Sequence, residues 1–355
     1  MSMREGVRVN KTRGLFGAQA VARVRMNMRN WSRNLACLAP NFVVQSGSMF
    51  MPNRIVSLLV MTCAVASGGP AKDSVQSYSS DLARGSNVPR SLFFAGAGAG
   101  LGIVASGEQS VFNKGLSMIF DNGVLLGTGT ADGPPVTPDL GAEVTGVPLG
   151  QLGYFRHFGD SDWLWGVKFS YSYLGATNLA AHNLVIPQVG TGTVPNVSSF
   201  EGFSVTKSYE VFVDHQMTMA PFVGRSFNNS FVYIGAGPSL SHVGASLNDL
   251  VGFATFPKGS LLPGLRDVSG RPQSDEQSQW AFGVAASGGV TYFITPSWFL
   301  DVNYTFSHPF PSKFHTQLPY RNDIYSPIVF EGTLIGDYTA KLNTHLITIS
   351  LNVGF

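Results

Sequence analysis

A strict alternation of apolar and polar residues at the C-terminal end is the feature that most constrains the fold. Between positions 347 and 355 the odd residues are apolar and the even residues are polar or small: Ile347, Ile349, Leu351, Val353 and Phe355 alternate with Thr348, Ser350, Asn352 and Gly354. Successive side chains of a β-strand point to opposite faces. The pattern predicts a strand with one apolar and one polar face, about as long as the 9–11 residues of a tilted transmembrane strand.

Other segments repeat this alternation. Apolar or aromatic residues occupy every second position of 163–173 and 298–306, and Val205, Tyr209, Val211, Val213, Met217 and Met219 share one parity opposite Glu210, Asp214, Gln216 and Thr218. A soluble β-sandwich also alternates, but its outward face would be densely charged. The polar faces here hold mostly Gly, Ala, Ser, Thr and Asn, and only 12% of all residues are charged. Such faces are typical of a narrow barrel interior.

The spacing of the predicted strands indicates how they connect. Eight strands are expected, at 91–105, 146–158, 162–175, 204–224, 230–243, 279–293, 297–309 and 338–355. Short connections (159–161, 225–229, 294–296) alternate with long ones rich in Gly, Pro, Asn, Ser and Thr (106–145, 176–203, 244–278, 310–337). This predicts an all-β fold, an eight-stranded antiparallel up-and-down transmembrane β-barrel with periplasmic turns and four long extracellular loops. An even number of strands closes the sheet and removes edges that lipid could not satisfy.

The N-terminal part has a different composition. Residues 1–48 hold eight basic residues against Glu5 alone, which leaves 15 basic and 20 acidic residues in the remainder. The basic residues are scattered, so a nucleic-acid-binding arm is disfavoured and no nucleic-acid partner is expected. Residues 49–71 have the layout of a signal peptide, with cleavage after Ala66 or Ala71 and a buried core helix as the alternative. Residues 1–48 are then interpreted as sequence upstream of the true start, and 72–90 as a periplasmic segment before the barrel of 91–355.

The chain resembles the small outer-membrane barrels of Gram-negative bacteria, of the opacity type and the outer-membrane-protein-A-like type. The terminal row of Ile347, Ile349, Leu351, Val353 and Phe355 carries this resemblance, together with the glycine-rich segment 93–102 and Val232–Pro238. The resemblance implies that the row is an assembly signal read by the barrel-assembly machinery. It implies a location in the outer membrane of a Gram-negative bacterium, with outer-membrane lipids and lipopolysaccharide as partners. The chain departs from it in its large loops and in having no peptidoglycan-binding domain after the barrel.

No catalytic, cofactor or metal site is predicted. Gly96–Gly102 does not complete a dinucleotide-binding pattern, and no His, Asp and Glu cluster has metal-ligand spacing. Ser307–His308 and Ser241–His242 suggest a hydrolase, but neighbours in a strand point to opposite faces, so neither pair can act as nucleophile and base. The alternative of a lipid A-modifying enzyme then depends on pairing across strands.

Four charged residues are predicted to face the lumen: Lys168, Glu210, Asp214 and Asp301. A charge in a narrow lumen is costly unless it is paired, so Lys168 is expected to bridge to Asp214 or Glu210 and to plug the barrel. The alternative places these groups in water near the rims. A plugged barrel favours a structural and surface-interaction protein whose loops contact host, phage or lipopolysaccharide. A hydrated lumen favours a narrow passive pore, porin-like in function.

Overall fold

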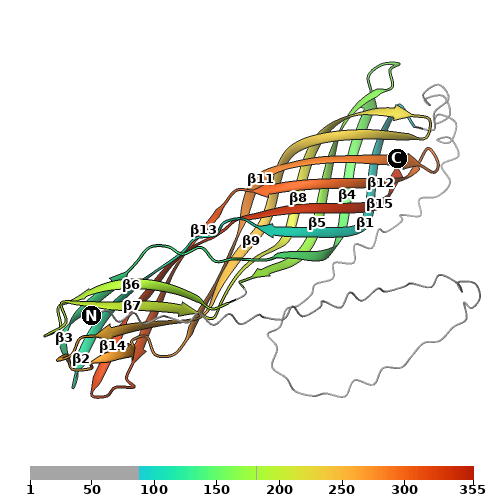
Figure 1. Cartoon of the computed structure of the whole chain (residues 1–355). Coiled ribbons are helices and arrows are strands. Elements are labelled where there is room, and N and C mark those ends of the chain that lie inside the picture. The colour runs from blue at the N-terminus through green and yellow to red at the C-terminus, as the bar shows by residue number, and fades with distance from the viewer. Residues whose placement is uncertain (1–87, 181) are drawn as a thin grey trace, which may run out of the picture. The chain divides into compact units, whose positions relative to one another are not determined.

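Eight long strands form the main body of the protein (Figure 1). The structure is a computed structural model, and it describes residues 88–180 and 182–355. The barrel strands are β1 (Ser91–Ser106), β4 (Ala142–His157), β5 (Trp163–Leu179), β8 (Ser208–Phe227), β9 (Ser230–Phe256), β11 (Gln273–Phe293), β12 (Trp298–Pro309) and β15 (Leu342–Gly354). Each overlaps one of the eight strands expected from the sequence. The segments 1–48 and 49–71, and most of 72–90, lie outside the described residues, so their interpretation stays a prediction.

The eight strands pair with their neighbours in chain order and close into a ring. The ring runs β1, β4, β5, β8, β9, β11, β12, β15 and back to β1, with every pairing antiparallel. The last strand pairs with the first along its length, from Phe94 opposite Gly354 to Ser106 opposite Leu342. The amide of Phe355 donates to the carbonyl of Phe93 at 2.9 Å and completes the ladder. The predicted eight-stranded antiparallel barrel is therefore confirmed, including closure of the C-terminal strand against the first one.

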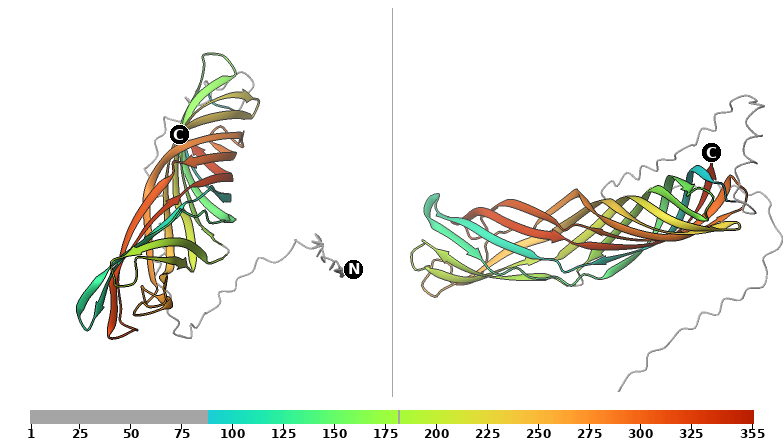
Figure 2. Two further views of the ribbon diagram at one scale, coloured as in Figure 1. Left: turned by 60° about the vertical axis from the view of Figure 1, so that its left-hand side comes forward. Right: turned by 90° about the horizontal axis from the view of Figure 1, so that it is seen from above.

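The two ends of the barrel differ. At one end, called the turn end, short segments join β4 to β5, β8 to β9 and β11 to β12. At the other, called the loop end, the four long connections leave the barrel. Figures 1 and 2 show the C-terminus at the turn end and strands β2, β3, β6, β7 and β14 beyond the loop end. The predicted alternation of short and long connections is confirmed.

The composition of the long connections predicted irregular loops, but the structure shows that they contain strands. They contain β2 (Val111–Asp121), β3 (Val124–Asp132), β6 (Leu184–Gly192), β7 (Ser199–Thr206), β10 (Gly264–Asp267), β13 (Ser312–Asn322) and β14 (Ile328–Ala340). With the far half of β9 they form a second antiparallel sheet, the loop sheet, in the order β9, β7, β6, β3, β2, β14, β13, and the short β10 pairs with the other side of β9. β9 belongs to both sheets and gives β7 a paired edge on which the loop sheet is built. The turn-forming composition of these segments disfavours strands, but hydrogen bonding to the edge of β9 stabilises them as strands. This pairing is long-range, so no local sequence pattern shows it.

Candidate functional site in the barrel lumen

Lys168 and Asp301 form a buried ion pair across the lumen. Lys168 lies on β5 and Asp301 on β12, four strands apart in either direction around the ring. The Lys168 Nζ to Asp301 Oδ2 distance is 3.2 Å, and each side chain is only 4% exposed. Because the strands stand opposite each other, the pair spans the lumen rather than following the wall. Sequence reasoning placed both residues in the lumen but did not pair them.

Other polar side chains complete the ion pair into the lumen network, which consists of Lys168, Asp301, Tyr233, Gln151, Thr291, Ser350 and Asn352. The Tyr233 hydroxyl accepts from Lys168 and donates to Asp301 Oδ1 at 2.9 Å. Gln151 Nε2 lies 3.3 Å from Asp301 Oδ2 and donates to Ser350 Oγ at 2.8 Å and to Asn352 Oδ1 at 2.7 Å. Thr291 Oγ1 donates to Asp301 Oδ1 at 3.3 Å.

The network joins strands β4, β5, β9, β11, β12 and β15 at one level of the barrel. A buried carboxylate is tolerated where charged and neutral donors satisfy its oxygens, and both oxygens of Asp301 are satisfied here. The ammonium of Lys168 also lies 4.6 Å from the centroid of the Tyr233 ring. The lumen network is thus a satisfied polar layer, and it fixes opposite walls of the barrel to each other.

An aromatic plug fills the lumen between this network and the turn end. Its members are the inward residues nearest the short turns: Leu92, Phe94, Phe155, Leu164, Phe222, Phe231, Phe293 and Phe299. The rings of Phe293 and Phe299 have centroids 4.8 Å apart, and those of Phe155 and Phe231 are 5.2 Å apart. Such close contacts between aromatic rings are favourable beyond the area they bury. The sequence analysis missed the plug because it treated the inward face as uniformly polar. These phenylalanines occupy alternate positions on the faces assigned to the lumen, and this position could have predicted the plug.

On the other side of the network the lumen is polar and then becomes apolar again. Thr344 donates to Gln216 Oε1 at 2.7 Å and Ser307 donates to Ser239 at 3.0 Å. Beyond them lies the loop-end cluster, in which inward valines and leucines of the barrel meet residues of the loop strands: Val104, Val147, Leu174, Val211, Val213, Val243, Leu247, Leu342 and Leu346 with Val111, Ile186, Phe314 and Tyr338. A polar section is therefore bounded by apolar packing at both ends.

Glu210 and Asp214 are placed differently from the prediction, because β8 contains a β-bulge. Val213 pairs with Val243 and His215 pairs with His242, so Asp214 is an extra residue. A bulge inserts one residue and changes which parity faces inward. Val211 and Val213 consequently point inward on one side of the bulge, whereas Gln216 and Thr218 do so on the other.

The expected bridge from Lys168 to Asp214 or Glu210 is therefore wrong. Lys168 pairs in register with Ala220, six residues from Asp214 along β8. At about 3.3 Å per residue this separation is roughly 20 Å, too far for an ion pair. Glu210 instead accepts from Asn248 at 3.0 Å, and Asp214 lies 3.6 Å from His242.

The outer wall is apolar where the sequence predicted it. Ile347, Ile349, Leu351, Val353 and Phe355 are between 37% and 69% exposed, while Thr348, Ser350 and Asn352 are buried. Around the turn end Trp163, Trp165, Tyr292 and Trp298 also point outward, each more than 40% exposed. Large apolar side chains that surround a closed ring are typical of a barrel in lipid. Among the described residues no helix is long and apolar enough to cross a membrane.

The structure offers no assembled catalytic pair at the two Ser–His sequences. Ser307 faces the lumen and donates to Ser239, whereas His308 bonds Asn343 at 2.6 Å. Ser241 is fully buried, and its neighbour His242 lies on the outer face beside Asp214. The serine and the histidine of each Ser–His sequence thus point to opposite faces of the strand, as expected. Within 88–180 and 182–355 no group of three or more His, Cys, Asp or Glu could hold a metal ion.

Comparison with known proteins gives little beyond the architecture. No family model matches the chain, and no curated protein matches it. Among solved structures it is similar to Neisserial surface protein A (13% identity, 74% of this chain and 97% of that one, TM-score 0.29). It is also similar to the outer membrane protein OprG from Pseudomonas aeruginosa (11%, 76% and 99%, TM-score 0.30) and to the outer membrane protease OmpT from Escherichia coli (9%, 74% and 97%, TM-score 0.22).

The chain's own geometry is more informative. It combines a closed ring of eight antiparallel strands, large apolar residues on the outside and a polar layer inside. This protein is an eight-stranded antiparallel β-barrel whose outer wall is apolar and whose lumen is filled by side chains.

Proposed function

We propose that this protein is a closed barrel with a structural and surface-interaction role, and that it presents the loop sheet outside the outer membrane. The observation that carries the proposal is the Lys168–Asp301 pair, which crosses the lumen at 3.2 Å directly above the aromatic plug. Eight strands leave an interior just wide enough to be filled by side chains. A lumen filled in this way holds the wall rigid and leaves the loop sheet as the part that meets partners.

The expected partners follow from where each surface lies. The apolar outer wall contacts outer-membrane lipids and lipopolysaccharide, and the row that ends at Phe355 is the part that the barrel-assembly machinery would recognise. The loop sheet would contact host or phage surface molecules. None of these roles requires a cofactor.

A narrow passive pore is the second candidate, because part of the lumen is polar. Gln216 Nε2, Ser241 Oγ, Ser287 Oγ and Asn303 Oδ1 are buried and make no hydrogen bond with any described residue. These groups suit a hydrated section. A pore would need the aromatic plug and the lumen network to open, however. A lipid A-modifying enzyme ranks third, because the Ser–His neighbours diverge.

Conductance of the refolded full chain in planar lipid bilayers tests the proposal. We expect no steady ion current from the wild type. Simultaneous Phe155→Ala and Phe293→Ala changes, combined with Lys168→Ala and Asp301→Ala, should produce a current, because together they remove side chains from both the plug and the lumen network while leaving the outer wall intact. Leu152→Ala, on the lipid-facing side of β4, is the matched control and should stay silent. A steady wild-type current whose ion selectivity changes in Lys168→Ala would favour the pore instead.

A further inference from the structure

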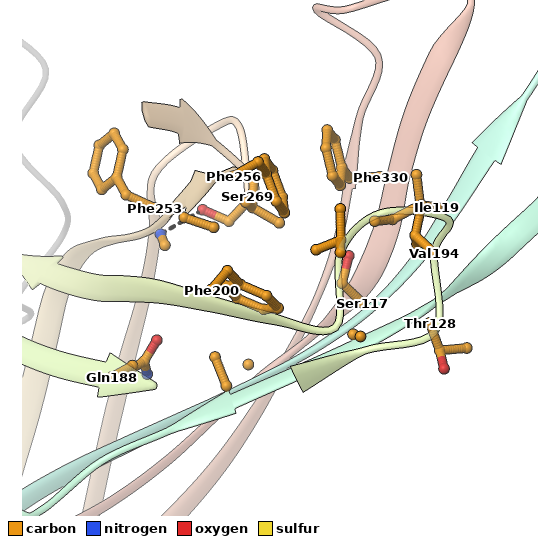
Figure 3. Close-up of a pocket in the computed structure, with 18 of the residues that line it drawn as sticks. Ser117, Ile119, Thr128, Gln188, Val194, Phe200, Phe253, Phe256, Ser269 and Phe330 are labelled. Carbon is orange, nitrogen blue, oxygen red and sulfur yellow. Dashed lines mark hydrogen bonds between the residues drawn. The ribbon is translucent and has the colours of Figure 1, made fainter. Parts of the chain in front are cut away.

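The loop sheet encloses a pocket that is separate from the lumen. Figure 3 shows side chains from several strands around it, among them Ser117 and Ile119 of β2, Phe200 of β7, Phe256 of β9 and Phe330 of β14. The sheet curves, so these residues face one another across the space although they are far apart in the sequence. The cavity volume is about 50 Å³, and the pocket is partly open to the outside.

Two of the glycines that line this pocket lie at positions where a larger side chain would fit. A Cβ added at Gly115 would meet only Leu334 at 4.0 Å, and one at Gly129 would meet Phe200 at 3.7 Å; both are ordinary van der Waals contacts. Several glycines of the barrel wall are different. A Cβ at Gly98 or Gly237 would lie 2.1 Å from a backbone oxygen of the neighbouring strand. Packing therefore requires glycine at Gly98 and Gly237 of the wall but does not require it at Gly115 and Gly129 of the pocket.

The chemistry of the lining defines what could enter. The residues that line the pocket include no charged side chain, and most of them are apolar. The Ser117 hydroxyl oxygen is buried there and interacts with the Tyr320 hydroxyl, which also lines the pocket, but it has no hydrogen bond that meets the usual distance and angle limits. A ligand site commonly combines an apolar lining with a few polar groups that orient the ligand. The pocket therefore suits an uncharged ligand with one hydrogen-bonding group.

We propose that this pocket binds a small uncharged molecule, made of a compact apolar group of a few carbon atoms and one hydrogen-bonding group placed at Ser117. An engineered cavity that accepts benzene measures about 150 Å³. A pocket of about 50 Å³ takes a smaller group. This proposal does not depend on a closed lumen, because none of the residues that line the pocket belongs to the aromatic plug or to the lumen network.

The test uses the refolded full chain in detergent micelles with isotope-labelled Ile, Leu and Val methyl groups. Xenon serves as a purely apolar probe and 2-methylpropan-1-ol as a probe with one hydroxyl. We expect saturating chemical-shift changes at Ile119 and Leu334, which line the pocket. The lipid-facing Ile234 and Ile349 report partition into the micelle and should drift linearly. A linear drift at all four methyl groups in the wild type would overturn the proposal without any variant.

Three variants locate the site. Gly115→Val should abolish saturation for both probes, because its methyl groups enter the pocket. Gly146→Val is the matched control on β4, where an added Cβ meets nothing within 4 Å, and it should bind as the wild type does. Ser117→Ala should weaken binding of the alcohol about two- to tenfold and leave xenon unchanged. Saturation that persists in Gly115→Val would overturn the site, and equal alcohol binding in Ser117→Ala would overturn the polar part of the ligand.

Discussion

The barrel and the loop sheet are both antiparallel β-structure, yet they differ in how the backbone hydrogen-bonding groups at their strand edges are paired. In the barrel every strand has a hydrogen-bonded neighbour on both sides, because β11 pairs with β9 and β15 pairs with β1. The loop sheet ends at β13, whose ladder among the described residues is with β14 alone. Side chains of β11 cover that edge: Gln273 and Gln277 donate to the carbonyls of Pro319 and His315, each at 2.8 Å.

We attribute this difference to the proposed arrangement, in which the barrel lies in lipid and the loop sheet in water. Lipid cannot satisfy an unpaired backbone group, so a membrane sheet has to close. Water can satisfy an edge, so the loop sheet can stay open and keep a pocket. We therefore expect changes in the barrel to act on assembly and global stability, and changes in the loop sheet to act locally.

The largest effect is expected from deleting Phe355. Its amide completes the ladder to Phe93, and its exposed ring ends the outward apolar row. Without it we expect the amount of assembled protein in the outer membrane to fall several-fold, as measured by heat-modifiable gel migration of membrane fractions. Phe355→Trp is the control because it keeps an aromatic residue.

Gly354 is a less suitable control for this deletion. A Cβ there would lie 2.4 Å from the Leu92 side chain in the aromatic plug. Equal membrane levels for the deletion and for Phe355→Trp would show that ring closure does not need the terminal aromatic residue.

Removal of Lys168 should have the next largest effect. Lys168→Ala leaves the Asp301 carboxylate buried without its charged partner, which costs about 3–5 kcal/mol for a desolvated pair. The measurement is urea unfolding in lipid vesicles. The double change Lys168→Met with Asp301→Leu should recover most of this loss, because an apolar pair of similar volume often replaces a buried ion pair at little cost. A loss below about 1 kcal/mol in Lys168→Ala would mean that water reaches the pair and that the lumen is not closed.

A smaller, local effect is expected when the edge of β13 loses its cover. Gln273→Ala together with Gln277→Ala removes two neutral hydrogen bonds to β13, each worth about 1 kcal/mol, and also the bond within β11 from Gln277 Nε2 to Asp275 Oδ2. Amide hydrogen exchange should become faster along β13 and stay unchanged along β12 and β15. Ser274→Ala is a matched control on the same strand; its hydroxyl accepts from the amide of Asp249 instead of contacting β13. Faster exchange throughout the barrel would show that the two regions unfold together.

The two regions also differ in how much of them the sequence predicted. In β15 lipid on one side and a narrow lumen on the other impose a period of two, so both the strand and its faces are visible in Ile347–Phe355. In β8 the same period was misread, because one bulge at Asp214 reverses the faces and no residue type announces it. Glu210 and Asp214 were assigned to the lumen for this reason.

The partner of Lys168 could not be predicted for a related reason. Strand patterning fixes which face a residue occupies but not its height relative to residues on opposite strands. That height depends on the stagger of the whole ring. Asp301 was recognised as a lumen residue, whereas its meeting with Lys168 needed the register of every pairing between β5 and β12. The strands of the loop sheet were missed because their edges are provided by β9, far away in the sequence.

The smallest effect is expected at an ion pair of the same chemistry on the loop side. Lys207 Nζ lies 3.1 Å from Asp249 Oδ2, a distance close to that of Lys168 and Asp301, but the two side chains are 72% and 44% exposed. Water screens such a pair, so Lys207→Ala should change the free energy of unfolding by about 0–1 kcal/mol, and less as salt rises. Urea unfolding in vesicles at low and high salt measures this beside Lys168→Ala. Because the distances match, the ratio of the two losses reports burial together with the contacts that Lys168 makes with Tyr233. If the two losses were equal, Asp301 would not be desolvated, and the aromatic plug would not keep water out of the lumen.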